Sequence, residues 1–125
     1  MKKAEACDIR EEVHKYVDST FKSGILKFIV LNALSKRSTY PYELYKRLRK
    51  VDFGMLRNVQ KSEVYNVLNS LEAKGLVRSA THLIGAKVQK EYSATKEGRR
   101  VAVRSRKVMA RNMMNVKRLI AYELE

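Results

Sequence analysis

The chain has 125 residues, a formal net charge of +14 and a single cysteine. This length predicts one domain with at most a helical extension, and 45% apolar with 32% charged residues excludes a collagenous or low-complexity chain. The most apolar run, residues 25–34, is too short to cross a bilayer, and no signal peptide is visible at the N-terminus. A lone cysteine excludes an internal disulfide and fits a reducing cytosol, so we expect a cytoplasmic protein.

The positive charge is unevenly distributed. Residues 1–20 carry a net charge of −1, residues 21–95 carry +9 and residues 96–125 carry +6. Because a small globule with such an excess repels itself, a polyanionic partner is expected, and nucleic acid is the first candidate. An anionic membrane is the weaker alternative, since no basic amphipathic segment stands apart from a folded pattern. A basic surface without a polyanionic partner is the third interpretation.

The first half of the chain predicts three helices. Apolar residues at helical spacing indicate one helix over residues 5–18 and a second over residues 21–35, with a break at Ser19 and Thr20 between them. The second helix is apolar over much of its circumference and is therefore expected to be the central, buried one. A third helix is predicted over about residues 38–50, with the only proline of the chain in its first turn.

Residues 62–74 predict a fourth helix with a divided surface. Ser62 is expected to cap its N-terminus and Gly75 to end it. At about 100° per residue, the apolar side chains form one stripe and small polar groups point away from it. The stripe consists of Val64, Val67, Leu68 and Leu71, and the outward face consists of Ser62, Asn66, Asn69 and Ala73, with Tyr65 at its flank.

A β-hairpin and a long helix complete the chain. Residues 76–81 and 87–93 predict two short strands joined by a loop at residues 83–86, and Thr95 caps a helix over about residues 96–124. Helices followed by a basic hairpin follow the winged helix-turn-helix plan. In that plan the helix before the hairpin enters the DNA major groove, and the hairpin loop reaches the backbone or the minor groove. We therefore expect a mainly α fold with a small β-hairpin.

Several short motifs, in this order, resemble those of PadR-type transcriptional regulators. Residues 21–34 resemble the opening helix of that family, and residues 42–44 (Tyr-Glu-Leu) resemble its Gly-Tyr-Glu-Leu motif. Residues 62–77 resemble its recognition helix and the turn into the wing, and residues 91–99 resemble its second wing strand and the start of its C-terminal helix. The resemblance implies a homodimeric DNA-binding repressor whose C-terminal helix forms the dimer. Some members of the family bind small hydrophobic effectors near the dimer interface.

The final helix has an apolar stripe at coiled-coil-like spacing, and it is longer than a domain of this size needs for its own core. We expect it to form a homodimer, or to fold back across the first helix, which has unpartnered apolar positions of its own. The chain then divides into an N-terminal helix (1–20), a winged helix-turn-helix domain (21–95) and a dimerisation helix (96–125). The stripe consists of Val101, Val108, Met109, Met113, Val116 and Ile120.

Two kinds of side chain are expected to contact nucleic acid. Short polar groups on the outward face of the fourth helix can hydrogen-bond to base edges, whereas basic side chains and tyrosine hydroxyls suit phosphates. Each of these residues is also an ordinary solvated or packing residue when taken alone, so the prediction rests on the set. The candidate DNA-binding residues are Tyr40, Arg47, Lys61, Ser62, Tyr65, Asn66, Asn69, Arg78, His82, Lys87 and Lys90.

The sequence contains no recognisable catalytic or metal-binding motif. There is no Gly-rich phosphate loop, no zinc motif and no nucleophile with a base at a familiar spacing, so neither enzymatic activity nor a metal or cofactor is expected. The predicted function is a sequence-specific regulator that binds double-stranded DNA and acts as a homodimeric repressor on the chromosome. Two alternatives stay open: an RNA-binding, ribosome-associated winged-helix protein, and a nucleoid protein that compacts DNA without sequence preference.

Overall fold

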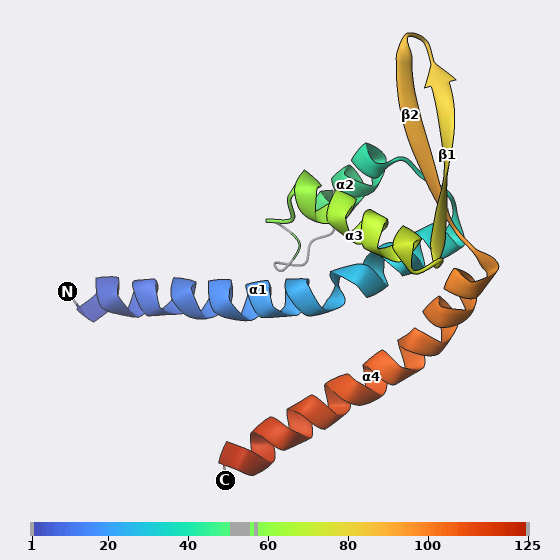
Figure 1. The fold of residues 1–125 in the computed structure, drawn as a ribbon. Coiled ribbons are helices and arrows are strands. Elements are labelled where there is room, and N and C mark those ends of the chain that lie inside the picture. Colours follow the sequence, from blue (N-terminus) through green and yellow to red (C-terminus); the bar gives the residue numbers. More distant parts are fainter. Residues whose placement is uncertain (1, 51–55, 57, 125) are drawn as a thin grey trace.

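A computed structural model describes residues 2–50, 56 and 58–124. In Figure 1 the shorter helices and the hairpin gather around the C-terminal part of the first helix, while its N-terminal half and the last helix leave this body as two diverging arms. The mainly helical fold with one antiparallel hairpin confirms the predicted fold class. The elements are α1 (Lys2–Lys36), α2 (Pro41–Lys50), α3 (Lys61–Ala73), β1 (Val77–Ile84), β2 (Lys87–Ala94) and α4 (Lys96–Leu124).

One hydrophobic core holds the body together. The C-terminal half of α1 lies at its centre, as the broad apolar circumference of that segment predicts. The apolar stripe predicted on α3 is confirmed as a face that packs in this core, and α2 packs there through Leu44 and Leu48. Tyr92 of β2 and Ala102 of α4 close the core on the other sides. The buried residues of the three helices are Leu26, Val30, Leu31, Leu34, Leu44, Leu48, Val64, Val67, Leu68 and Leu71.

The predicted break at Ser19 and Thr20 is wrong, because α1 continues through both positions. The Thr20 hydroxyl donates a hydrogen bond to the carbonyl oxygen of Tyr16 at 2.8 Å, so it is satisfied one turn back within the helix and caps nothing. Serine and threonine reduce helix stability by only about 0.5 kcal/mol each, which does not end a helix anchored by packing further along. The helices expected over residues 5–18 and 21–35 are therefore one helix.

The start of α3 also differs from the prediction, since its N-cap is Gln60 and not Ser62. The Gln60 backbone N–H donates to the Glu63 carboxylate at 3.1 Å, and Lys22 of α1 donates to the same oxygen at 3.1 Å. This pair of contacts fixes the first turn of α3 and ties it to α1. Ser62 consequently lies inside that turn, where its side chain is exposed.

The hairpin turn is tighter than predicted. Ile84 lies opposite Lys87, so Gly85 and Ala86 alone make the turn, and the four-residue loop over 83–86 is wrong. Gly85 has a φ of 61°, a conformation that glycine adopts without a steric penalty and that fits the first central position of a type II′ turn. Both strands are eight residues long as a result, and the hairpin projects well beyond the body (Figure 1).

Contacts at the base of the hairpin set its direction. Thr39, in the link between α1 and α2, pairs with Tyr92 of β2 through backbone hydrogen bonds of 2.8 and 3.0 Å. The Ser79 hydroxyl of β1 donates to the Glu72 carboxylate of α3 at 2.7 Å. The hairpin is therefore held against both α3 and the segment that precedes α2.

The start of α4 is fixed in the same region. Thr95 is confirmed as its cap, since the Gly98 N–H donates to the Thr95 hydroxyl oxygen at 3.0 Å, and that hydroxyl donates to the Gly75 carbonyl at 2.8 Å. A Cβ atom on Gly98 would overlap the carbonyl oxygen of Leu76, so the close approach of α4 to the preceding turn requires glycine there.

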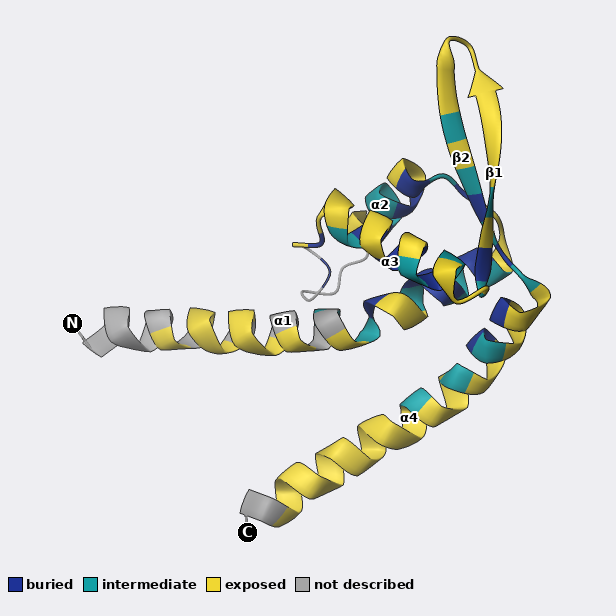
Figure 2. Cartoon of the chain, viewed as in Figure 1, coloured by how far each residue is buried: buried dark blue, intermediate teal, exposed yellow. Residues whose placement is uncertain are grey.

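The side chains that the structure describes on the two arms are largely exposed (Figure 2). Ile9, Val13 and Val17 of α1 retain 59%, 54% and 41% of their accessible surface. α4 does not fold back across residues 5–18; it lies beside residues 20–32 of α1, and Arg106 of α4 donates a hydrogen bond to the Asn32 side-chain oxygen at 2.9 Å. Within the described residues, no helix combines the length and the apolarity that crossing a membrane requires.

Candidate nucleic-acid interface

The outward face of α3 is polar and exposed. Ser62, Asn66 and Asn69 lie on it, and Tyr65 beside them keeps 45% of its surface accessible. The opposite face of α3 is buried in the core, so the orientation predicted from the helical period is confirmed. A carboxamide offers a donor and an acceptor that match the major-groove edge of adenine, and a serine hydroxyl serves several bases. This surface can therefore approach base edges closely.

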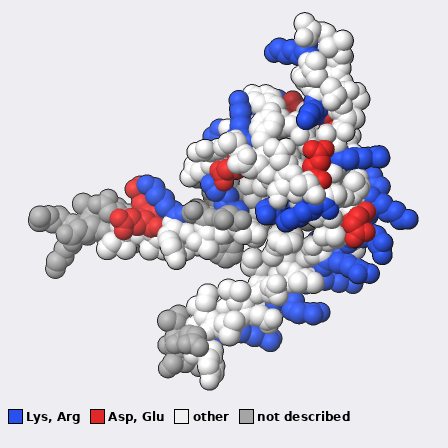
Figure 3. All heavy atoms as spheres, viewed as in Figure 1, with Lys and Arg blue, Asp and Glu red and all other residues white. Residues whose placement is uncertain are grey.

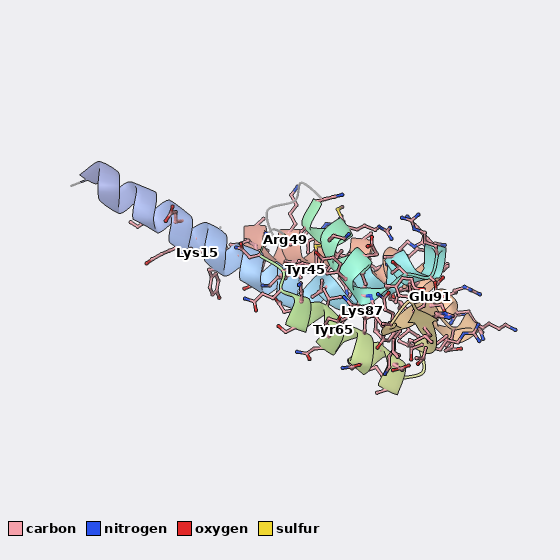
Figure 4. The ribbon with its side chains drawn as sticks, turned by 90° about the horizontal axis from the view of Figure 1, so that it is seen from above. Lys15, Tyr45, Arg49, Tyr65, Lys87 and Glu91 are labelled. Carbon is pink, nitrogen blue, oxygen red and sulfur yellow. The ribbon has the colours of Figure 1, made fainter. Side chains whose placement is uncertain are left out.

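Lys61 precedes that face, and its Nζ lies over two tyrosine rings of α2. The distances to the ring centroids are 4.9 Å for Tyr42 and 5.8 Å for Tyr45. Lys46 lies 4.8 Å from the Tyr42 centroid, and Arg49 lies 5.7 Å from the Tyr45 centroid and donates to its hydroxyl at 3.0 Å (Figure 4). We call these five residues the aromatic–basic cluster. The sequence offers only one signal of it, two tyrosines followed by basic residues at helical spacing on α2.

A hollow of about 420 Å³ lies next to the outward face of α3. Tyr40 before α2, Tyr65 of α3 and Lys90 of β2 line it, so the structure brings together three predicted residues from separate elements. Buried Tyr92 also lines the hollow. Burial, and then the electrostatic influence of Glu72 and Tyr65, raise the pKa of the Tyr92 hydroxyl above its ordinary value of 10.0.

Arg78 and His82 lie on the other side of the hairpin. Successive strand residues alternate between faces, and the face opposite theirs carries the hydrogen bond to α3. His82 Nε2 is 3.3 Å from a Glu91 carboxylate oxygen, and its ring centroid is 6.4 Å from that of Tyr40. The structure therefore does not place these two residues beside the outward face of α3.

Lys87 and Arg47 have contrasting environments. Lys87 directly follows the hairpin turn and is exposed at the tip of the wing. Arg47 is half-buried on α2 between the inward residues Leu44 and Leu48, and its Nη1 is buried with no hydrogen-bond partner among the described residues. Arg47 is thus less available to an external phosphate than the prediction assumed.

The distribution of charge follows the pattern of the sequence. In Figure 3, Lys and Arg side chains outnumber acidic ones on the body and along α4, whereas the described part of the first arm shows acidic side chains beside a basic one. In the part of the chain that the structure describes, no three His, Cys, Asp or Glu side chains are grouped closely enough to hold a metal ion.

An apolar groove of about 520 Å³ separates α1 from α4. Ile25 and Phe28 of α1 form one wall, and the predicted apolar stripe of α4 forms the other. Val101 and Met109 of that stripe are half-buried. The other stripe residues are exposed. The exposed fractions are 51% for Val108 and 39% for Met113, which line the groove, and 48% for Val116 and 56% for Ile120 further along α4.

Three helices in one core, followed by a hairpin anchored beside the third, define a winged helix-turn-helix domain. Residues 30–104 match the sequence model of the transcriptional regulator PadR-like family, and the chain belongs to that family. It is a PadR family transcriptional regulator, as the motifs predict.

Solved structures share this fold. A PadR family transcriptional regulator from Eggerthella lenta DSM 2243 is 24% identical, with a TM-score of 0.78 over 90% of this chain and 96% of that one. A PadR-like transcriptional regulator from Bacillus cereus strain ATCC 14579 is 21% identical, with a TM-score of 0.67 over 82% and 97% of the two chains. Bacillus subtilis PadR, solved in complex with operator DNA, is 25% identical, with a TM-score of 0.55 over 62% of this chain and 44% of that one. Comparison with curated proteins found no match.

Proposed function

We propose that this chain is a homodimeric repressor that binds double-stranded operator DNA with α3 in the major groove. The observation that carries the proposal is the outward face of α3, where Ser62, Asn66 and Asn69 are exposed next to an anchored wing. A surface-exposed helix of this length ordinarily carries Lys and Glu on its free side. Short donors and acceptors in their place suit contact with base edges. The relative from Bacillus subtilis, solved in complex with operator DNA, supports the same use of this fold.

Base reading and backbone binding are assigned to different residues. The exposed polar residues of α3 are the base readers, and Tyr65 borders them. Lys61 at the start of α3, Lys90 beside the hollow and Lys87 at the wing tip carry long cationic chains that suit phosphates, as does the Tyr40 hydroxyl. Three further predicted residues could contact only the DNA backbone and not the bases, because none of them lies on the outward face of α3. They are Arg47, Arg78 and His82.

Dimer formation is proposed through the two arms. One face of α1 lines the groove at Gly24, and the same helical face carries Ile9, Val13 and Val17 toward the N-terminus. The apolar stripe of α1 therefore extends beyond the groove that it forms with α4. The stripe on α4 likewise continues through Val116 and Ile120. A second copy would cover both stripes at once.

Charge supports the same pairing. The first arm lies in the segment with a net charge of −1, and α4 lies in the segment with +6. The arm of one copy therefore complements α4 of the other in charge as well as in apolar surface. A dimer also doubles the number of reading helices, because each copy presents one α3 to one half-site. Occupation of operator DNA by such a dimer would block transcription from it.

The first experiment compares nucleic acids in filter binding. We expect the chain to retain duplex DNA at salt concentrations that release duplex RNA and both single strands, because a rigid α3 fits the B-form major groove and not the deep, narrow one of RNA. Equal or tighter retention of RNA contradicts the proposal and favours a ribosome-associated role.

A further inference from the structure

The aromatic–basic cluster brings three cations together. Lys46 and Lys61 approach the same Tyr42 ring, at 4.8 and 4.9 Å, from two different helices, and Arg49 covers the neighbouring Tyr45. The rings of Tyr42 and Tyr45 lie 6.3 Å apart at a tilt of 32° and form one aromatic platform.

Among the residues that the structure describes, the charges of the cluster are poorly balanced. Lys46 is paired with Glu43 at 3.0 Å, and that pair is largely exposed. Three cations beside this one described carboxylate repel one another, and an additional anion would relieve the repulsion. The ring faces compensate for part of this repulsion, since the negative quadrupole of a tyrosine attracts an ammonium or a guanidinium.

The location of the cluster identifies the anion. Lys61 is the first residue of α3 and is followed at once by Ser62 on the outward face, so a strand whose bases meet that face carries its phosphates past the start of the helix. Tyr42 also lines the hollow that holds Tyr65 and Lys90. We propose that the cluster is a phosphate clamp for the DNA backbone, in which Tyr42 and Tyr45 are positioning residues that hold Lys61, Lys46 and Arg49 toward one phosphodiester strand. This inference rests on the proposed DNA binding by α3.

The rings, and not their hydroxyl groups, do the positioning at Tyr42. Tyr42→Phe keeps the aromatic face and should bind DNA like the parent chain, whereas Tyr42→Leu keeps the apolar volume but loses the quadrupole. We expect Tyr42→Leu to weaken binding roughly 2–5-fold per half-site, from the contribution of an exposed cation–π contact. The loss should be the same on cognate and random duplexes, because phosphates carry no sequence.

The experiment is a fluorescence-anisotropy titration of a labelled duplex at several salt concentrations. Lys61→Met should make the slope of log K against log salt shallower by about one unit for each phosphate that is no longer neutralised, and Lys74→Met, at the far end of α3, should leave it unchanged. In a Lys46→Met/Lys61→Met background, Tyr42→Leu should cost little further affinity. The lysine variants lie on the surface and test the clamp even if Tyr42→Leu lowers stability.

The possible results separate the clamp from the function on which it rests. If the parent chain does not prefer duplex DNA, the proposed function fails. If the parent binds duplex DNA but Lys61→Met keeps its salt slope, or Tyr42→Phe binds as poorly as Tyr42→Leu, the clamp is overturned while DNA binding by α3 stands. Equal losses for Tyr42→Leu with and without the two lysines also overturn it, since the ring would then act independently of the cations.

Discussion

The body and the arms of this molecule differ in how they bury apolar surface. In the body, α1, α2 and α3 meet in a closed core where Val30, Val64 and Leu68 are fully buried. In the arms, apolar residues recur just as regularly along α1 and α4 but stay exposed (Figure 2). The difference indicates that the body folds around itself, whereas the arms keep apolar surface exposed. In the function that we propose, DNA reading and assembly therefore belong to separate parts of one chain.

The largest effect on the proposed division between body and arms is expected from charged residues in the apolar stripe of α4. Met113→Glu with Val116→Glu would place carboxylates in an otherwise apolar interface, so we expect the dimer to dissociate into folded monomers. DNA affinity should fall about 10²–10⁴-fold, because the two half-sites are no longer bound together. Light scattering and a gel shift measure the two effects. Asn115→Glu, off the stripe, is the control, and a double variant that stays a folded dimer disproves the proposed interface.

A cavity in the core of the body should change stability in a different way from a truncation on an arm. Leu68→Ala removes a side chain with 0% exposure, and we expect it to lower the free energy of unfolding by about 2–5 kcal/mol at a fixed protein concentration. Ile120→Ala, at a stripe position with 56% exposure in the single chain, should affect mainly the concentration dependence of melting. Thermal melts at two protein concentrations distinguish them. Similar, concentration-independent losses for both would mean that the arms belong to the core of the single chain.

Within the body, base reading is tested at Asn66. Asn66→Ala should cost about 1–3 kcal/mol per subunit on the cognate duplex and much less on random DNA, because the hydrogen bonds that it removes go to one base edge. Gel-shift titrations on both duplexes measure this, with Asn115→Ala on α4 as the matched control. Equal weakening on both duplexes would mean that Asn66 reads no base, and would favour sequence-tolerant compaction of DNA.

The smallest expected effect belongs to the wing tip. Lys87→Ala should weaken cognate and random duplexes alike and make the salt slope shallower by about one unit for each phosphate that the side chain had neutralised. For a dimer that neutralises about 6–10 phosphates, the parent slope should lie near −5 to −9. Lys27→Ala on α1 serves as the control. An unchanged slope for Lys87→Ala removes the wing tip from the interface.

The sequence predicts the faces of the helices better than their ends. The 3.6-residue period assigns the inward and outward residues of α3 correctly, because burial follows directly from that period. The ends depend on individual hydrogen bonds, which composition does not determine. Thr95 caps α4 as predicted. The Thr20 hydroxyl, in contrast, donates to a carbonyl oxygen one turn back within α1. Gln60 is the N-cap of α3 in place of Ser62, because the Glu63 carboxylate accepts a hydrogen bond from the Gln60 backbone.

The interface itself could be predicted only in part. The outward residues of α3 follow from one helix alone, whereas the aromatic–basic cluster requires the packing of α2 against α3. Nothing in the sequence places Lys61 over Tyr42, or puts His82 and Lys90 on opposite faces of a hairpin whose register depends on a two-residue turn. Such long-range placements come from tertiary packing and not from local pattern.

A nuclease footprint on the DNA upstream of the gene for this chain tests the proposed function most directly. A dimer that presents two α3 helices should protect one pseudo-palindrome, with half-sites about 34–36 Å apart or a multiple of that distance. The Asn66→Ala variant should lose that protection at concentrations where the parent retains it. Uniform protection along the fragment, unchanged by Asn66→Ala, would contradict sequence-specific reading by α3.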